Sequence, residues 1–165
     1  MRLYTKLVKR FIISFCIMMC TCGLFAVEFT PFYTSARFEA NMNSYERAAF
    51  GAGLDVFYSL TPKLKVGAGG MFSCDFTEFN CLELLSYAGY MVKLGKKVRF
   101  LPEISIGYEQ IWNDGDVHQT VSSGAHIKLI FDIAKISNAN FVFIPYAGAG
   151  FPYLWRGGAS LGIRF

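Results

Sequence analysis

Ionisable side chains stand at regular positions inside segments that are otherwise apolar or rich in glycine. They are Asp55, Lys65, Arg99, Glu103, Glu109, His126, Lys128, Asp132 and Arg164. In an extended chain each of them shares one face with small or polar neighbours, while apolar residues occupy the other face. Such a set can line a polar path for small solutes, or it can form packed ion pairs that satisfy buried charge. Because Arg99, Glu103 and Lys128 lie on neighbouring segments, we expect them to pair.

The two cysteines of "CDFTEFNC" offer redox chemistry. Cys74 and Cys81 are separated by six residues, and in an oxidising compartment they would close a small disulfide loop. The alternative is two free thiols, either because the compartment lacks disulfide-forming enzymes or because the side chains are too far apart. Two cysteines alone make a poor metal site, so no metal is expected here.

A third polar group lies in "NDGDVHQ", where Asp114, Asp116 and His118 are close in sequence. These residue types suit a surface cation site or an acid–base pair for lipid chemistry. The composition from Asn113 to Asp116 is, however, typical of a solvated turn. We therefore predict a turn here.

A hydrolytic site would need a nucleophile within hydrogen-bond reach of a base. His126 is the candidate base, but Lys128 occupies the same-face position two residues later. Ser122 lies four residues earlier, which is too distant along a strand. The glycine-rich stretches 67–70 and 148–150 have no helix after them, so they are not phosphate-binding loops. We expect neither an enzyme nor a bound cofactor.

The elements that position these residues are β-strands. Apolar residues alternate with small or polar residues through 50–60, 64–73, 82–94, 98–109, 121–133 and 158–165, which is typical of strands with one apolar face. Two weaker strands are expected at 141–155, which contains Pro145, and at about 28–40, which Pro31 interrupts. Turn-forming residues separate the runs, and no run has a helical period. The fold class predicted is all-β, with eight strands.

The first 26 residues predict a signal peptide. Four basic residues precede an apolar run at 11–27, and the small residue Ala26 suits cleavage. An uncleaved membrane helix is an alternative, and so is a lipoprotein that uses Cys20 or Cys22. Cleavage would leave residues 27–165 as one domain, with 12 basic and 12 acidic residues. This balanced charge gives no reason to expect a nucleic-acid partner.

Composition distinguishes two kinds of barrel. Asp, Glu, Lys and Arg make up 17% of the chain, against ~25% in soluble domains. A soluble barrel turns its apolar face inward, whereas a membrane barrel turns it to lipid and fills its lumen with small or polar residues. Because the polar faces are rich in glycine and poor in lysine, we predict an eight-stranded antiparallel up-and-down transmembrane β-barrel. Side chains fill the interior of so narrow a barrel, which favours packed ion pairs over an open path.

The C-terminal segment "ASLGIRF" carries a resemblance to a known family. Leu161, Ile163 and Phe165 share one face, and the chain ends on an aromatic residue. This pattern is similar to the last strand of the small eight-stranded outer-membrane proteins, the group of OmpX, OmpW and the OmpA membrane domain. The resemblance implies that these three residues form the signal read by the outer-membrane barrel assembly machinery. It also implies a place in the bacterial outer membrane, among its lipids.

The connections suggest which end of the barrel faces outward. Short links are predicted at 61–63, 95–97 and 137–140, and longer, surface-exposed outer loops near 41–47, 74–81, 112–120 and 151–156. We expect a monomer with a structural or small-solute permeation role, similar to that of a porin. The alternative is a surface-exposed adhesin or host-factor-binding protein, which would bind an extracellular ligand through the outer loops.

Overall fold

The structure is a computed structural model that describes residues 32–44 and 46–165. The predicted signal peptide, residues 1–26, lies outside the described residues, as does the start of the first predicted strand. No helix within the described ranges is long and apolar enough to cross a membrane.

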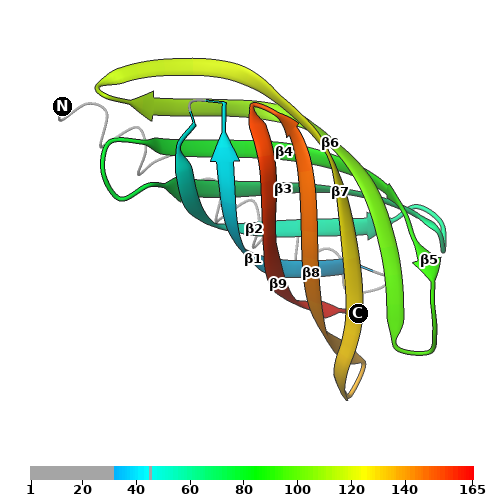
Figure 1. Ribbon diagram of the computed structural model, residues 1–165. Helices are drawn as coiled ribbons and strands as arrows, with labels where there is room; N and C mark the ends of the chain where they lie inside the picture. Colours follow the sequence, from blue (N-terminus) through cyan, green and yellow to red (C-terminus); the bar gives the residue numbers. More distant parts are fainter. Residues whose placement is uncertain (1–31, 45) are drawn as a thin grey trace. The chain divides into compact units, whose positions relative to one another are not determined.

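Strands account for nearly all of the described chain (Figure 1). The strands are β1 Phe32–Asn43, β2 Ala48–Ser59, β3 Leu64–Cys74, β4 Asn80–Tyr90, β5 Val92–Lys93, β6 Val98–Asn113, β7 Asp116–Ile136, β8 Ala139–Phe151 and β9 Tyr153–Arg164. The short β5 follows β4 after Met91, and both pair with β6. They therefore act as one interrupted strand, which confirms the predicted count of eight.

Every pair of neighbouring strands is antiparallel, and the sheet closes on itself. Strands β2, β3 and β4 follow one another on one side of β1, and β9, β8, β7 and β6 follow on the other. The β4–β6 pairing joins the two sides, with Asn80 opposite Trp112 and Gly89 opposite Glu103. The predicted antiparallel up-and-down barrel is thereby confirmed.

The predicted faces point as a membrane barrel requires. On β2 the apolar residues Phe50 and Leu54 are 59% and 45% exposed, whereas Asp55, one residue further on, is buried. On β6, Ile104 and Ile106 are exposed, and Glu103 between its apolar neighbours is buried. Because side chains alternate along a strand, the apolar residues cover the outside and the charged residues enter the interior.

The connections at both ends of the barrel are short, which corrects part of the prediction. We call the end with Phe32 and Phe165 the terminal pole; its links are 60–63, 94–97 and 137–138. The opposite end is the distal pole, and its links are 44–47, 75–79, 114–115 and 152. The predicted outer loops 112–120 and 151–156 are wrong, since strands occupy most of both ranges.

Local chemistry explains the shorter links. Asp114 and Gly115 both have positive φ, 51° and 89°, as a two-residue hairpin turn with a right-handed strand twist requires. Asp-Gly is a preferred sequence for this turn, and alternation resumes at once in the following residues. At 152 a single proline separates β8 from β9.

Apolar side chains fill both ends of the interior. Toward the terminal pole, a buried cluster consists of Tyr33, Phe57, Leu85, Tyr87, Met91, Leu101, Ile130, Val142 and Ile144. Toward the distal pole, a smaller one consists of Ala49, Phe79, Cys81, Ile111 and Tyr153. We call these the terminal cluster and the distal cluster. Buried polar and charged residues occupy the rest of the interior.

Candidate functional site

Arg156 of β9 is the centre of the interior charge network. Its Nε lies 3.2 Å from Glu39 Oε1, and its guanidinium donates a 2.8 Å hydrogen bond to Glu83 Oε2. Ser122 donates to the same Glu83 carboxylate at 2.7 Å, and Tyr146 donates to Glu39 at 2.7 Å. Four strands therefore converge on one buried arginine.

A second group surrounds Glu103 of β6. Lys128 Nζ lies 2.7 Å from Glu103 Oε1, and His126 Nδ1 lies 3.7 Å from the same oxygen. The Lys128 ammonium also lies 4.6 Å from the ring centroid of Phe57 and 4.9 Å from that of Tyr87, within the range of cation–π attraction. Lys128 is thus held between a carboxylate and the aromatic rings of the terminal cluster.

A third group links β1, β2 and β4. The Arg37 guanidinium lies 3.6 Å from Asp55 Oδ1, and Tyr87 donates a 3.1 Å hydrogen bond to the same oxygen. Gly69 of β3 makes room for this carboxylate, because a Cβ at residue 69 would overlap Asp55 Oδ1. The glycine-rich polar faces seen in the sequence therefore serve to accommodate long charged side chains.

Glu109 anchors a fourth group next to the distal cluster. Its Oε1 accepts hydrogen bonds from the Cys81 thiol at 2.7 Å and from the Tyr153 hydroxyl at 2.5 Å. The Arg156 guanidinium lies 4.1 Å from the Tyr153 ring centroid, which connects this group to the central network. Ser122 and Cys81, which could be nucleophiles, each donate to a carboxylate in this arrangement.

Arg99 departs from its predicted pairing. Lys128 and Glu103 form an ion pair as expected, but Arg99 forms two hydrogen bonds with Asp132, at 2.9 and 2.8 Å. Arg164 approaches the same carboxylate at 3.4 Å. Arg99 lies at the start of β6 beside the terminal pole, four residues before Glu103, so it meets the half-buried Asp132 rather than the interior.

Of the two alternatives for Cys74 and Cys81, a disulfide or two free thiols, the structure has the free thiols. In the β3–β4 ladder Cys81 lies opposite Ser73, and Cys74 lies opposite Asn80. Cys81 is buried in the interior, whereas Cys74 shares the outward face with Phe72. The register therefore puts the two side chains on opposite faces of the wall, where no bond can join them.

The remaining predicted residues divide between interior and pole. Lys65 is buried at the terminal pole, where its Nζ donates a 2.5 Å hydrogen bond to Ser59. Leu161 and Phe165 face outward, 57% and 61% exposed. Four residues at the core of the network were absent from the predicted set: Arg37, Glu39, Glu83 and Arg156. Alternation along the strand also places these residues on the polar face. Arg37 and Glu39 belong to the first predicted strand, which was weakly defined because Pro31 interrupts it, and Arg156 lies in a range predicted to be a loop.

Arg47 joins three hairpins at the distal pole. Its guanidinium lies 3.2 Å from Asp75, 3.3 Å from Asp114 and 3.9 Å from Glu78. Asp114 is thus part of an ion cluster at a tight turn, and Asp116 and His118 are exposed on β7. Within the described part of the chain, no three ligating side chains are placed to hold a metal ion.

Asp75 is expected to stay ionised in acid. Burial raises its pKa, but hydrogen bonds from the Thr77 and Phe79 amides and from Arg47 lower that pKa to about 2. Because the folded value is below the usual ~3.9, the stabilisation is present above pH ~4 and is lost as the pH falls through about 2. A titration of the Asp75 carboxyl carbon by NMR measures this directly.

Two variants separate the contribution of Arg47 to the lowered pKa of Asp75 from that of the backbone amides. Arg47→Ala should raise the pKa of Asp75 only part of the way, since the two amide donors remain, and Lys96→Ala at the terminal pole should leave it unchanged. A carboxyl that titrates near pH 4 in the unmodified protein would show that the hairpins are not held in this arrangement.

The two poles carry opposite charge. The basic residues of the terminal pole are Lys63, Lys65, Lys93, Lys96, Lys97, Arg99, Lys135 and Arg164, and Asp132 is the acidic residue among the described residues there. The acidic residues of the distal pole are Glu46, Asp75, Glu78, Asp114 and Asp116, and they face the single basic residue Arg47. The barrel therefore has a basic terminal pole and an acidic distal pole.

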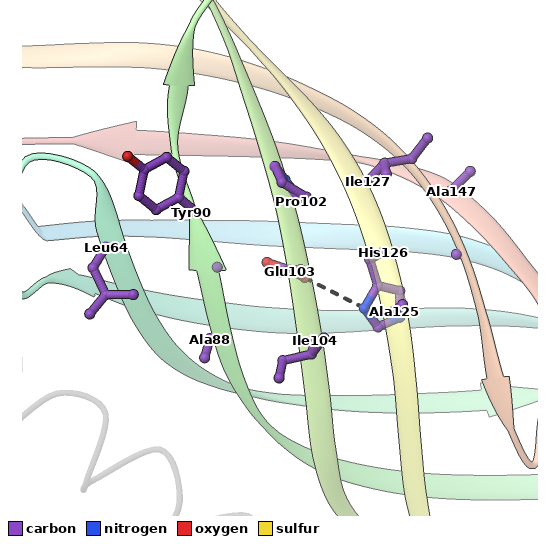
Figure 2. Close-up of a pocket in the computed structure, with 12 residues that line it drawn as sticks. Leu64, Ala88, Tyr90, Pro102, Glu103, Ile104, Ala125, His126, Ile127 and Ala147 are labelled. Atoms are coloured by element: carbon purple, nitrogen blue, oxygen red, sulfur yellow. Dashed lines mark ion pairs between the residues drawn. The ribbon is translucent and has the colours of Figure 1, made fainter.

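A groove of about 610 Å³ lies on the outer wall, next to the basic pole (Figure 2). Leu64, Tyr90, Ile104 and Ile127 border it, and all four are exposed. Small residues form its base: Ala88, Gly89, Ala125, Ala147 and Gly148. Glu103 and His126, joined by the dashed line in Figure 2, contribute from behind the strands.

Comparison with known proteins identifies the fold. No protein-family model matches the sequence, and no curated protein matches it. The structure is similar to that of Neisserial surface protein A, with a TM-score of 0.58 and 13% identity, over 82% of this chain and 95% of that one. It is also similar to the N-terminal β-barrel domain of OprF from Pseudomonas aeruginosa, with a TM-score of 0.53 and 15% identity, over 83% and 100% of the two chains.

A designed transmembrane β-barrel is a comparably good match, with a TM-score of 0.56, 14% identity, and coverage of 84% of this chain and 100% of that one. At such identities the likeness shows the fold and not a shared activity. The chain has the fold of the small eight-stranded outer-membrane barrels.

Proposed function

From this fold we propose that the chain is an integral protein of the bacterial outer membrane, with a lumen closed to solutes and a structural role. The observation that carries the proposal is the packed interior. Phe57, Tyr87 and Leu101 of the terminal cluster lie at one end of the buried charges, and Phe79 and Tyr153 of the distal cluster lie at the other. A solute would have to displace both clusters and break the Arg156 ion pairs.

The packed interior gives less support to small-solute permeation than to a structural role. The interior acids and bases are bonded to each other: Arg156 to Glu39 and Glu83, and Lys128 to Glu103. Charges that neutralise each other do not offer a hydrated path. In the described part of the chain Ser122 and Cys81 each donate a hydrogen bond to a carboxylate, and we propose that the protein is not an enzyme.

The alternative, binding of an extracellular ligand by the outer loops, is limited by their size. The distal link at 114–115 is a tight turn, and Arg47 ties three of the hairpins together. Residues 149–155 continue past the last β8–β9 pair, but most of them stay paired with β7 or β1. We propose that this pole faces the exterior and that the terminal pole faces the periplasm, where assembly machinery reads Leu161, Ile163 and Phe165. Membrane lipids are the proposed partners of the exposed apolar wall, and a monomer is the proposed state.

Conductance tests the closed lumen. The folded protein, reconstituted in a planar lipid bilayer, is expected to show no discrete conductance steps in 1 M salt. Heat-dependent gel mobility of the same sample is the control, because it establishes that the barrel is folded. Reproducible steps from a correctly folded sample would overturn the proposal and would favour a solute conduit.

A further inference from the structure

The outer-wall groove has small residues at its base and larger ones at its border. Alanine and glycine of β4, β7 and β8 form the base, and β6 crosses it with Pro102 and Ile104. Its volume of about 610 Å³ lies within the ~300–1,000 Å³ range of small-molecule sites. Ile104 and Ile127, at 66% and 55% exposure, stand above this base as its walls.

A break in the sheet accompanies the groove. The β4–β6 ladder ends at Gly89 opposite Glu103, and pairing resumes only at Val92 opposite Phe100. Pro102 lies within the intervening stretch of β6, and a proline has no N–H to donate to a ladder. On the other edge of β4, the Met91 amide donates to the Lys63 carbonyl at 2.7 Å and so continues the β3–β4 ladder. The gap in pairing is therefore confined to the β4–β6 side, next to the groove.

Positive charge lies at the end of the groove that meets the terminal pole. Lys63 precedes Leu64, a groove residue, and its ammonium lies 5.8 Å from the ring centroid of Tyr90, another groove residue. Lys93 of β5 lies opposite Arg99 in register, so it shares the polar face of Arg99 and does not belong to the groove. An apolar hollow thus leads to a basic edge, which is the order of parts in an anionic lipid lying along a membrane wall.

We propose that this groove binds an anionic diacyl phospholipid of the surrounding leaflet, with an acyl chain over Ala88, Ala125 and Ala147 and the phosphate at Lys63. The proposal rests on the proposed membrane location, because it takes the outer wall to face lipid. Basic side chains near a membrane surface attract anionic headgroups, and the small residues let the chain lie against the backbone. Tyr90 lies between the apolar base of the groove and the basic end, as expected of an aromatic residue at the membrane interface.

Native mass spectrometry of the purified, delipidated protein in detergent tests the site. Phosphatidylglycerol and phosphatidylcholine with the same acyl chains are the probes. We expect one phosphatidylglycerol to be retained at concentrations where phosphatidylcholine is not. Replacing the lysine, Lys63→Gln, should weaken retention about fivefold, since one basic residue near a membrane surface contributes about that factor.

Filling the groove tests its apolar part. Ala125→Phe and Ala147→Phe should each reduce retention of phosphatidylglycerol, and because both side chains face outward the fold should persist. Ala52→Phe is the matched control, since Ala52 faces outward on β2 and is not part of the groove. Lys135→Gln is the control for the overall charge of the pole. Heat-dependent gel mobility verifies the fold of every variant.

Several outcomes of these measurements would overturn lipid binding in the groove. Equal retention of the two lipids, or an equal loss in the Lys135→Gln and Lys63→Gln variants, would overturn the proposal and leave only general attraction to the basic pole. Unchanged retention in both alanine variants would also overturn it. These outcomes leave the closed lumen untouched, whereas conductance steps would overturn the closed lumen without affecting lipid retention.

Discussion

Replacing Arg156 with methionine is expected to lower the free energy of unfolding of the barrel by about 3–5 kcal/mol, the usual cost of removing one partner of a buried ion pair. Methionine is shorter than arginine, but its unbranched, flexible side chain keeps much of the volume and adapts to gaps. What is lost is the cation that lies between Glu39 and Glu83. Both carboxylates would then remain buried at 4% exposure or less without it.

Urea unfolding of the protein in lipid vesicles, followed by tryptophan fluorescence, gives this difference. Arg47→Met is the matched control, because its side chain is 32% exposed and exposed ion pairs contribute only about 0–1 kcal/mol. A triple variant that adds Glu39→Gln and Glu83→Gln should recover part of the loss, since the uncompensated charges are gone. If Arg156→Met costs no more than Arg47→Met, the network is hydrated and the closed lumen is wrong.

Alanine at two adjacent glycines of β9 should have opposite effects. A Cβ at residue 158 would overlap the backbone carbonyl oxygen of Phe38 and approach the Glu39 Cα at 2.9 Å. Because backbone atoms of a closed barrel cannot move aside locally, Gly158→Ala is expected to cost about 1–3 kcal/mol, as overpacking does elsewhere. It should also displace Glu39 from Arg156.

Gly157→Ala is the control on the same strand. Its Cβ would meet only the Tyr146 carbonyl oxygen, at 3.7 Å, which is an ordinary contact. Alanine is also less costly to order than glycine in a strand, so a gain of up to about 0.5–1 kcal/mol is expected. The same urea titration measures both. Equal effects of the two substitutions would contradict the inward direction of residue 158.

Alternation along each strand was enough to predict the faces of the barrel. On β6 and β7 the sequence places Glu103 and Lys128 on the polar faces, and the structure shows both buried. This prediction was possible because side chains alternate between the two faces of a strand. Once one apolar residue is assigned to the outside, its neighbours must point into the interior. The number of strands follows from the same runs.

Pairing between strands was harder to predict, because a face does not specify a register. Arg99 and Glu103 share a face, yet Arg99 lies nearer the pole and bonds to Asp132. Cys74 and Cys81 are close in sequence, yet Cys81 lies opposite Ser73 and the two thiols point to different sides. These contacts depend on how far each strand is shifted against the next.

The outer-wall groove had no sequence signal of its own. Ala88, Ala125 and Ala147 come from three strands and become neighbours only through the ladders that connect β4, β6, β7 and β8. Each is an unremarkable small residue in its own strand. The charge difference between the poles was hidden for the same reason, since it appears only when the links are sorted by the end of the barrel to which they belong.

That charge difference also bears on the way the barrel can enter a membrane. One end must pass through hydrocarbon while the other stays in water, and each bare charge carried through costs several kcal/mol. The distal pole is the less costly leading end, because its turn at 114–115 has only two residues and Arg47 already neutralises part of its acidity. The lysines at the other end would each have to be carried through hydrocarbon if that end entered first. We therefore propose that this difference in cost between the two ends sets the direction of insertion.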